Sequence, residues 1–171
     1  SNGKDLWIGT EKNGLFHMNT DDERIIRFPL GNGALENSVT IIAGKGNFIW
    51  AGTKKGLCKI DQPTGKIKWY SINQGGLPHN SIRNLYLDAE ERLWVSTKSS
   101  ILAFIVDEKV TKIPLNLGSG ILTLGPVTED TDSRVWVGSD GNGLFLVESD
   151  TATNLTKNEG LLSDYCYSLI S

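Results

Sequence analysis

Four tryptophans recur at nearly equal spacing, and this spacing restricts the folds open to the chain. Trp7, Trp50, Trp94 and Trp136 are separated by 43, 44 and 42 residues. Each lies in a similar phrase, typified by Leu6–Thr10: an apolar residue, Trp, a small apolar residue, Gly or Ser, and Thr or Ser. A Gly-Leu pair follows three of the four phrases. A period of about 40 to 45 residues built from short strands is the signature of a β-propeller blade.

Alignment of the repeats predicts four strands per period, named a to d from the inside outward and bounded by Gly, Asn, Asp and Pro. Strand b is the Trp phrase. The other expected strands are 38–43, 81–88, 121–128 and 163–171 for a; 57–61, 101–106 and 144–148 for c; and 24–28, 66–72, 110–114 and a weaker 151–156 for d. We therefore predict an all-β chain of about four four-stranded antiparallel blades. We expect residues 1–171 to form a single propeller segment, a fragment of a larger propeller.

Packing between blades explains why Trp and Gly recur. A large ring fills the widening wedge between neighbouring blades, at roughly 25 cal/mol per Å² of apolar area buried. The Gly two residues after each Trp lies on the same strand face. We expect it to leave room for side chains of the next blade.

Composition and charge exclude several classes of partner. The formal net charge is -3, whereas a nucleic-acid-binding surface requires a basic stripe, so no nucleic acid is expected to bind. No apolar run approaches the roughly 20 residues that span a bilayer. The two cysteines, Cys58 and Cys166, lack metal-type spacing and fall in non-equivalent strands of different blades. We therefore expect free, buried thiols and no metal or cofactor.

One segment carries a more specific phrase. Residues 76–85 read Gly-Leu-Pro-His-Asn-Ser-Ile-Arg-Asn-Leu, and Leu93–Thr97 follows them. Together they resemble the two-component regulator propeller repeat, with degraded copies at 32–39 and 160–164. The resemblance implies a non-catalytic sensor region of a hybrid two-component regulator, of the kind that responds to carbohydrate fragments in gut Bacteroidetes. It implies a periplasmic location in a parent anchored in the inner membrane, and a propeller of about seven blades.

Ligand candidates lie on one rim of the predicted propeller. The a–b and c–d turns form an acidic rim, whereas the d–a and b–c turns form a neutral rim that includes Lys54 and Lys55. On the neutral rim, His79, Asn80 and Arg83 lie at the start of an axis-lining strand. By fold analogy, these five residues are the candidate ligand-binding site for an oligosaccharide, and the lysines would suit an acidic sugar. The 78–80 loop also fits ordinary turn chemistry, with Pro fixing φ and Asn accepting local bonds.

Two other functions are considered. A protein-binding scaffold would use the blade faces or the acidic rim. A streptogramin-lyase-like enzyme would need a metal held by histidine and glutamate at the ring centre, but of the two histidines, His17 and His79, only His79 reaches the appropriate rim. The acidic run 129–132 lacks the Gly and distal Glu of a calcium loop, so we expect a solvated turn. No enzyme and no metal site are predicted.

An open arc of four blades would expose two apolar blade faces, which mark interaction sites. The chain is therefore expected to pair with a second copy as a homodimer through these faces. Alternatively, it closes its own ring by pairing Tyr165–Ile170 with the first Trp strand.

Overall fold

The computed structural model describes residues 5–115, 123–148 and 151–171, which form fifteen strands and one short 3-10 helix, η1 (Lys157–Glu159). Blade 1 consists of β1 (Asp5–Thr10), β2 (Gly14–Asn19) and β3 (Ile25–Phe28). Blade 2 consists of β4 (Val39–Lys45), β5 (Phe48–Thr53), β6 (Leu57–Asp61) and β7 (Ile67–Tyr70). Blade 3 consists of β8 (Ile82–Leu87), β9 (Leu93–Thr97), β10 (Ile101–Val106) and β11 (Lys109–Pro114). Blade 4 consists of β12 (Leu124–Glu129), β13 (Val135–Ser139), β14 (Leu144–Glu148) and β15 (Thr151–Leu155).

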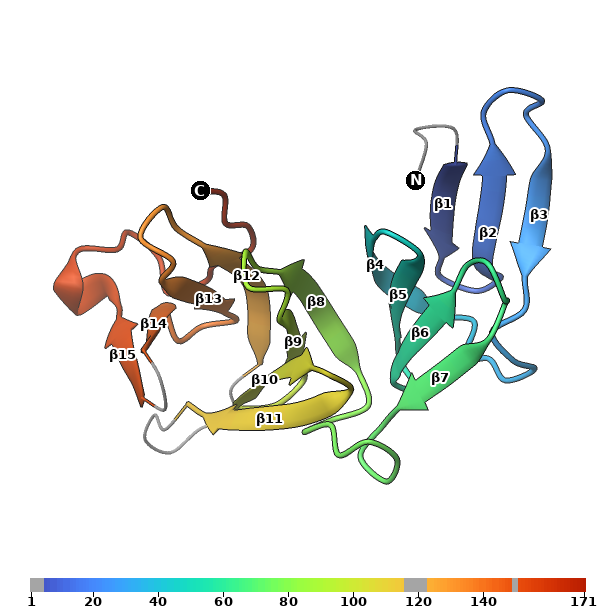
Figure 1. The fold of residues 1–171 in the computed structure, drawn as a ribbon. Helices are drawn as coiled ribbons and strands as arrows, with labels where there is room; N and C mark the ends of the chain where they lie inside the picture. The colour runs from blue at the N-terminus through green and yellow to red at the C-terminus, as the bar shows by residue number, and fades with distance from the viewer. Residues whose placement is uncertain (1–4, 116–122, 149–150) are drawn as a thin grey trace.

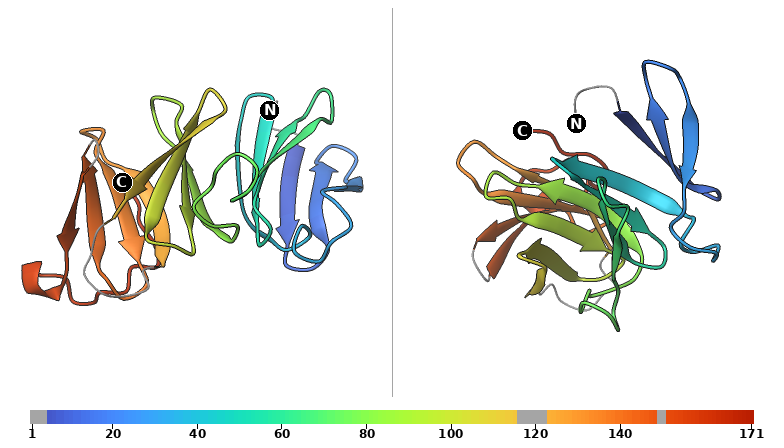
Figure 2. Two further views of the ribbon diagram at one scale, coloured as in Figure 1. Left: turned by 90° about the horizontal axis from the view of Figure 1, so that it is seen from below. Right: turned by 45° about the vertical axis from the view of Figure 1, so that its right-hand side comes forward.

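Each blade is an antiparallel sheet whose strands are neighbours in chain order (Figure 1). Three blades have four strands, and blade 1 has the three strands expected for b, c and d. The sheets stand side by side in an arc, with β4, β8 and β12 innermost in their blades (Figure 2). The predicted propeller fold is confirmed. Of the expected inner strand 121–128, residues 121–122 lie outside the described residues.

The core consists of three apolar clusters, one between each pair of successive blades. Trp94, only 3% exposed, packs in the cluster between blades 3 and 4. Trp50 packs against the cluster between blades 2 and 3, and Trp7 against the one between blades 1 and 2. The predicted role of the tryptophans as wedges between blades is confirmed for these three.

The glycines of the Trp phrases are sites of close approach between blades. A methyl group at Gly52 would lie 2.6 Å from Cγ2 of Ile82 on the next inner strand. Gly9 meets Cγ1 of Val39 in the same way. Blade 3 has Ser96 in place of the glycine. The Oγ of Ser96 donates to the carbonyl oxygen of Gly125 on the next blade at 2.6 Å, so this side chain makes the contact between the blades. The predicted need for space is therefore confirmed at Gly9 and Gly52.

The hydroxyl that ends the phrase closes the following turn. Oγ1 of Thr10 and Thr53, and Oγ of Ser139, each donate at 2.8 Å to the carbonyl oxygen of the glycine in the next turn. The phrase thus supplies a Trp ring that fills the space between blades, a small residue that leaves room for the next inner strand, and a hydroxyl that closes the following turn.

The C-terminal segment differs from the prediction. Residues 163–171 form no strand and make one isolated bridge, between Asp140 and Tyr165. The predicted pairing of Tyr165–Ile170 with β1 is absent, since β1 pairs only with β2 among the described residues. An inner strand is held by the Trp strand of its own blade, as β4 is held by β5, and no described strand is placed to do this for residues 163–171.

Both cysteines are free thiols, as expected. Cys58 is buried, as expected, whereas Cys166 is only half-buried, since the segment that carries it joins no sheet.

Candidate functional site

A cleft of about 310 Å³ lies at the inner strands of blades 2, 3 and 4, bordered by the C-terminal segment. The polar residues of its lining are Thr40 from β4, Lys54 from the β5–β6 turn, Ser81, Arg83 and Asn84 at β8, Asp140 from the β13–β14 turn, and Tyr167. This is the neutral rim named in the sequence analysis.

Lys54 and Arg83 give the cleft its charge. Their side chains come from neighbouring blades, both residues are exposed, and neither forms an ion pair within the described part of the chain. Among the described residues of the lining, Asp140 is the only acidic one. The cleft therefore offers two unpaired cations against one carboxylate, which favours an anionic ligand.

Hydrogen bonds between inner strands fix the floor of the cleft. Oγ1 of Thr40 lies 2.9 Å from the carbonyl oxygen of Ile82, which joins blade 2 to blade 3. Oδ1 of Asn84 accepts from the backbone N–H of Val127 at 3.4 Å, which joins blade 3 to blade 4. These two bonds fix Thr40 and Asn84 relative to the neighbouring inner strands.

The other three predicted residues lie outside the cleft lining and have structural partners. Nδ1 of His79 accepts from the backbone N–H of Ser81 at 2.9 Å, and Oδ1 of Asn80 accepts from that of Ile72 at 2.8 Å. Lys55 pairs with Glu36. The structure therefore brings Lys54 and Arg83 together, and the contacts of His79 and Asn80 are those of ordinary turn chemistry.

The role of Asn80 recurs in the degraded copies of the repeat. Nδ2 of Asn37 donates to the carbonyl oxygen of Gly33 at 2.9 Å, and Oδ1 of Asp164 accepts from the N–H of Lys157 at 2.8 Å. In each case the side chain ties the loop that leads into the next inner-strand position. The repeated Asn or Asp thus holds the loop, whichever blade it precedes.

The acidic run 129–132 is not simply a solvated turn, contrary to our expectation. Oδ2 of Asp130 accepts from Nε1 of Trp136 at 2.7 Å and from Nε of Arg134 at 2.8 Å. The hydrogen bond from Trp136 is the main cause that lowers the pKa of Asp130 to about 2. Glu129 is buried, and its Oε2 accepts from the backbone N–H of Ala89 at 2.9 Å. The run therefore anchors the Trp and joins blade 4 to blade 3.

Asp88 does the same in blade 3. Its Oδ2 accepts from Nε1 of Trp94 at 2.7 Å and from Nε of Arg92 at 2.5 Å. The spacing Asp-x3-Arg-x-Trp occurs in both blades and is the sequence signal that the prediction missed.

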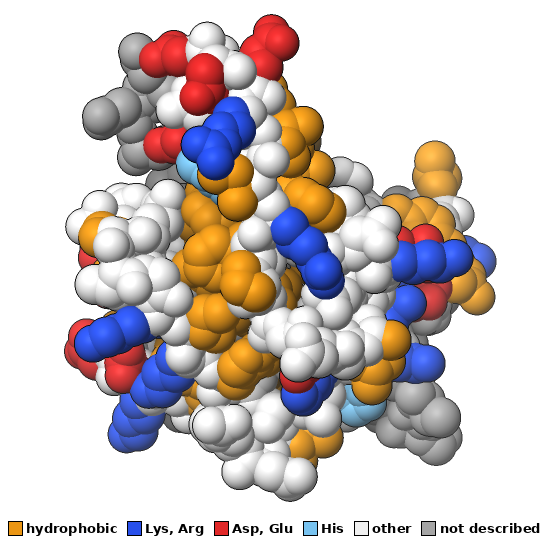
Figure 3. All heavy atoms as spheres, turned by 90° about the vertical axis from the view of Figure 1, so that its right-hand side faces the viewer, with side chains coloured by type: hydrophobic (Ala, Val, Ile, Leu, Met, Phe, Trp, Pro, Cys, Tyr) orange, Lys and Arg blue, Asp and Glu red, His pale blue; other side chains and the backbone are white. Residues whose placement is uncertain are grey.

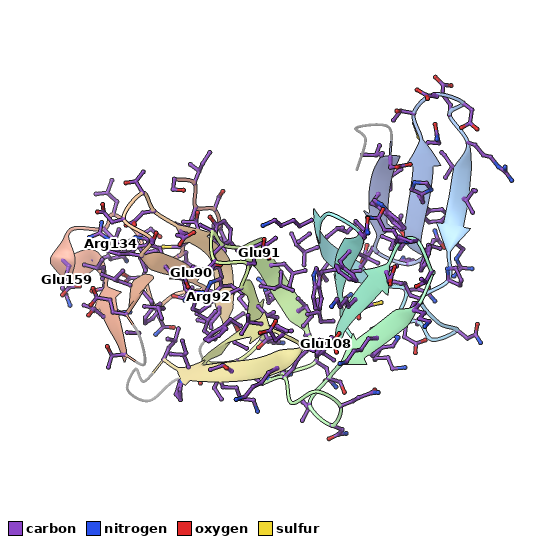
Figure 4. All side chains as sticks on the ribbon, viewed as in Figure 1. Glu90, Glu91, Arg92, Glu108, Arg134 and Glu159 are labelled. Atoms are coloured by element: carbon purple, nitrogen blue, oxygen red, sulfur yellow. The ribbon has the colours of Figure 1, made fainter. Side chains whose placement is uncertain are left out.

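Two larger grooves lie between blades on the opposite rim. One, of about 710 Å³, separates blades 2 and 3, and its charged groups are largely paired with one another. Lys45 bonds Glu91 at 2.8 Å, and Glu108 bonds both Lys59 and Lys68, at 3.3 and 2.7 Å. Figure 4 shows Glu108 where β11 approaches β6 and β7.

The other groove, of about 490 Å³, lies between blades 1 and 2. Within it, Nε2 of His17 lies 2.8 Å from Oδ1 of Asp5, and Nε1 of Trp7 donates to Gln62 at 3.3 Å. Because the charges in both grooves are largely satisfied, we take the smaller cleft with its unpaired cations as the candidate site.

The described residues include side chains of the types that bind metals or act as nucleophiles. No group of three or more His, Cys, Asp and Glu side chains among them is placed to hold a metal ion. Burial raises the pKa of the Cys58 thiol to about 12, which removes its nucleophilic thiolate at neutral pH. No helix in the described ranges is long and apolar enough to span a membrane.

Comparison with solved structures supports the fold. The chain is similar to the extracellular domain of a putative one-component system from B. thetaiotaomicron, with 24% identity, a TM-score of 0.78, and 90% of this chain and 21% of that chain covered. It is similar to the extracellular domain of a putative hybrid two-component system from B. thetaiotaomicron, with 22% identity, a TM-score of 0.75, and coverage of 96% and 23%. It also resembles virginiamycin B lyase from Staphylococcus aureus, with 17% identity, a TM-score of 0.71, and coverage of 88% and 51%.

These likenesses show a propeller architecture, and the chain spans about a fifth of the length of the two extracellular domains. No curated protein sequence matches the chain. The family model described as two-component regulator propeller matches residues 76–99, the stretch that enters blade 3 and continues through β8 and β9. Residues 76–99 are therefore a two-component regulator propeller repeat, set in a chain that is built of propeller blades throughout its described length.

Proposed function

We propose that the chain is a non-catalytic, ligand-sensing propeller segment from the periplasmic region of a two-component regulator anchored in the inner membrane. Its ligand is an acidic oligosaccharide, one sugar unit of which enters the cleft between the inner strands. The observation that carries this proposal is the pair of unpaired cations, Lys54 and Arg83, which different blades place at one cleft.

The chemistry of the cleft fits a sugar carboxylate. A guanidinium binds a carboxylate through two parallel hydrogen bonds, and an ammonium adds a compact positive charge. The hydroxyl groups of Ser81 and Tyr167 and the amide of Asn84 can bond to sugar hydroxyls. A volume of about 310 Å³ is at the small end of ligand pockets, which favours one ring of a longer chain.

A non-catalytic role is supported by the similar structures that are extracellular domains of regulators, and by the chemistry of the cleft. In the described part of the chain, its lining contains one carboxylate, Asp140, and no histidine. The similarity to virginiamycin B lyase is one of fold and carries no activity to this chain.

Calorimetric titration tests the proposal. Short galacturonic acid oligomers are the probe, and neutral galactose oligomers of equal length are the comparison. The acidic oligomers are expected to bind at least tenfold more tightly, because a hydrogen bond to a charged group contributes about 1.5–3 kcal/mol. Arg83→Gln and Lys54→Gln should each weaken that binding about tenfold or more.

Lys55→Gln is the matched control, since it removes the same charge from the same turn but outside the cleft. It should leave the affinity unchanged. If Lys55→Gln weakened binding as much as Lys54→Gln does, the effect would come from overall charge and not from the cleft. If no acidic oligomer bound, the proposal of an acidic sugar would be wrong.

A protein-binding scaffold is the second candidate function. It is favoured by the exposed apolar side chains at the two ends of the arc, such as Ile25 and Ile170. Binding of a protein that survives both Lys54→Gln and Arg83→Gln would support it over sugar sensing.

A further inference from the structure

The indole N–H of Trp50 is left without a partner in the described part of the chain. Trp50 is half-buried and lines the groove of about 710 Å³ between blades 2 and 3. The other three repeated tryptophans donate this N–H to side chains of the protein, which are those of Gln62, Asp88 and Asp130. An unpaired donor that is partly shielded from water gains from a ligand that brings an acceptor. The groove therefore offers a binding group that the other blades use within the fold.

The turn before Trp50 explains this difference. In each complete blade, the residue before the Trp lies opposite a partner on the inner strand. The residue that directly follows this partner is Asp88 in blade 3 and Asp130 in blade 4. The same rule gives Lys45 in blade 2. An ammonium thus replaces the carboxylate that accepts from the indole in the other two blades.

A cation over the ring is kept in blade 2. The guanidinium carbon of Arg92 lies 5.4 Å from the ring centroid of Trp94, and its Nε bonds the aspartate of that blade. Nζ of Lys59, on the strand next to Trp50, lies 5.3 Å from the ring centroid of Trp50 and 4.3 Å from that of Phe48. Blade 2 therefore has the indole donor and the cation, but not the carboxylate that joins them in blade 3. A carboxylate brought by a ligand would complete the set.

The two walls of the groove have opposite charge. Lys45 and Lys59 line it from blade 2, and acidic side chains line it from blade 3, which are those of Glu90, Glu91, Asp107 and Glu108. In Figure 4, Glu91 and Glu108 lie on the side of blade 3 that faces blade 2. The groove differs in this from the face of the molecule on the side of blade 1, where hydrophobic side chains gather across the middle (Figure 3). Walls of opposite charge favour a ligand that has both an ammonium and a carboxylate.

The ion pairs that cross the groove do not prevent such a ligand from binding. The lysines bond Glu91 and Glu108, whose side chains are 72% and 53% exposed. Exposed pairs contribute little to stability, and a zwitterion supplies a new partner for each wall. Asp107 is exposed and forms no ion pair within the described residues, so it is free to accept an ammonium.

Each wall also has an exposed apolar side chain in the groove. Phe48 on blade 2 is 40% exposed, and Val106 on blade 3 is 37% exposed. An apolar side chain of the ligand would remove the surface of both from water. The walls approach closely, since Nζ of Lys59 lies 3.3 Å from Oε1 of Glu108. This short span fits an α-amino acid, whose two charged groups are attached to one carbon atom.

We propose that the groove between blades 2 and 3 binds a free α-amino acid with an apolar side chain. The carboxylate of the ligand accepts from the indole N–H of Trp50 and from Lys59. Its ammonium bonds Asp107 on the opposite wall, and its side chain packs on Phe48 and Val106. This proposal does not rest on the function proposed above, which concerns the cleft on the other rim.

Titration of the isotope-labelled chain, followed by NMR, tests the contact with Trp50. L-Phenylalanine at neutral pH is the probe, and it should shift the indole N–H signal of Trp50, which Trp50→Phe assigns. The signals of Trp94 and Trp136 should stay in place, because their N–H groups are bonded to aspartates. The proposal would be wrong if the Trp50 signal stayed unchanged or if all of these signals shifted equally.

Calorimetry with two analogues tests the need for both charges. Hydrocinnamate has the ring and the carboxylate of L-phenylalanine but no ammonium, and phenethylamine has the ring and the ammonium but no carboxylate. Each should bind about tenfold or more weakly than L-phenylalanine, because each leaves one wall without its new partner. Equal affinities of the three compounds would exclude a zwitterion site.

Two variants assign the charges to residues. Lys59→Gln should weaken the binding of L-phenylalanine about tenfold or more. Lys66→Gln is the matched control, since it removes the same charge from the same blade outside the groove lining, and it should leave the affinity unchanged. Asp107→Asn should weaken the binding of L-phenylalanine but not that of hydrocinnamate. Residue 107 has φ of +47°, which Asn tolerates, so the turn is kept.

The same measurements separate this groove from the cleft on the other rim. Lys54→Gln removes a cation of that cleft and should leave the binding of L-phenylalanine unchanged. Equal weakening by Lys59→Gln and Lys66→Gln, or by Lys59→Gln and Lys54→Gln, would overturn the assignment of the ligand to this groove.

Discussion

Single carboxylates position the tryptophans that the blades are built around. Asp88 and Asp130 each accept a hydrogen bond from the indole N–H of the following Trp and from an arginine side chain between them. The guanidinium of Arg92 also lies 5.4 Å from the ring of Trp94. Each carboxylate therefore ties the a–b turn to the ring that fills the wedge between blades.

The ionised state of Asp130 should stabilise the fold above a defined pH. Its pKa of about 2 in the fold lies below the value of about 3.9 for an unfolded chain. A group with a lowered pKa contributes stability that is fully present above its unfolded pKa and is lost as pH falls through its folded pKa. The advantage in unfolding free energy of the parent chain over Asp130→Asn should therefore be constant above about pH 5 and shrink between about pH 4 and 2. Urea unfolding across this range measures it.

Glu91→Gln is the comparison for that experiment, since the pKa of Glu91 is also lowered, but by its exposed ion pair with Lys45 on the neighbouring blade. Because salt screens exposed charges, its pH-dependent difference should disappear at about 1 M NaCl, whereas that of Asp130→Asn should remain. Because the main cause of the Asp130 shift is the indole N–H, Trp136→Phe should reduce the pH-dependent difference. An undiminished difference in the Trp136→Phe background would assign the effect to the hydrogen bonds from Arg134 and the backbone instead.

At the scale of elements, the sequence predicted strands wherever their partners are local. The inner strand expected at 81–88 is β8, Ile82–Leu87, and the one expected at 38–43 is β4, Val39–Lys45. The segment 163–171 has a similar pattern but forms no strand. Periodicity shows which residues can pair, whereas pairing itself depends on a strand placed by the rest of the fold.

The candidate site was predictable to a similar extent. Lys54 and Arg83 lie on a turn and on an inner strand that must reach the same rim, and they do meet. Lys55 follows Lys54 directly but extends to Glu36 on the preceding loop, which no pattern in the sequence indicated. Tyr167 joined the cleft because of the path of the C-terminal segment, which was mispredicted.

Gly52 tests how tightly the inner strands meet. An added methyl group at this position would lie 2.6 Å from Cγ2 of Ile82 and 2.7 Å from Cγ2 of Ile41. Overpacking of this kind costs about 1–3 kcal/mol, so Gly52→Ala should lower the free energy of unfolding by that amount. In an Ile82→Ala background the added methyl group no longer clashes with Cγ2 of residue 82. Gly52→Ala should therefore lower the free energy of unfolding by less in that background. Urea unfolding of the parent chain, the two single variants and the double variant gives the coupling free energy between Gly52→Ala and Ile82→Ala. An equal cost of Gly52→Ala in both backgrounds would show that Ile82 is not the obstacle.

For the whole molecule, apolar seams and not ion pairs hold the arc together. The seam between blades 2 and 3 contains fully buried side chains such as Leu57 and Ile82. The ion pairs across the same junction involve Glu91 and Glu108, whose side chains are 72% and 53% exposed. Exposed pairs contribute about 0–1 kcal/mol each and are screened by salt. The junction should therefore survive at high ionic strength.

Glu108 allows the two contributions to be separated. It ends the two-residue turn between β10 and β11 with φ of +63°, a left-handed conformation that favours glycine, and its carboxylate reaches Lys59 and Lys68 on blade 2. At about 1 M NaCl, Glu108→Gly should raise the free energy of unfolding by about 1 kcal/mol, because the backbone strain is relieved and the lost ion pairs were already screened. At about 20 mM NaCl the loss of the ion pairs should offset much of that gain.

Glu108→Gln keeps the strained backbone and removes only the charge, so it isolates the ionic part. Urea unfolding should find it less stable than the parent chain at about 20 mM NaCl and equal to it at about 1 M, because salt weakens exposed ion pairs. If the deficit of Glu108→Gln persisted at high salt, the junction would depend on the hydrogen bonds of Glu108 and not on the seam alone. Apolar seams of the same kind join the blades at all three junctions. The balance between seam and ion pairs measured at Glu108 would therefore indicate how each blade is held by the next.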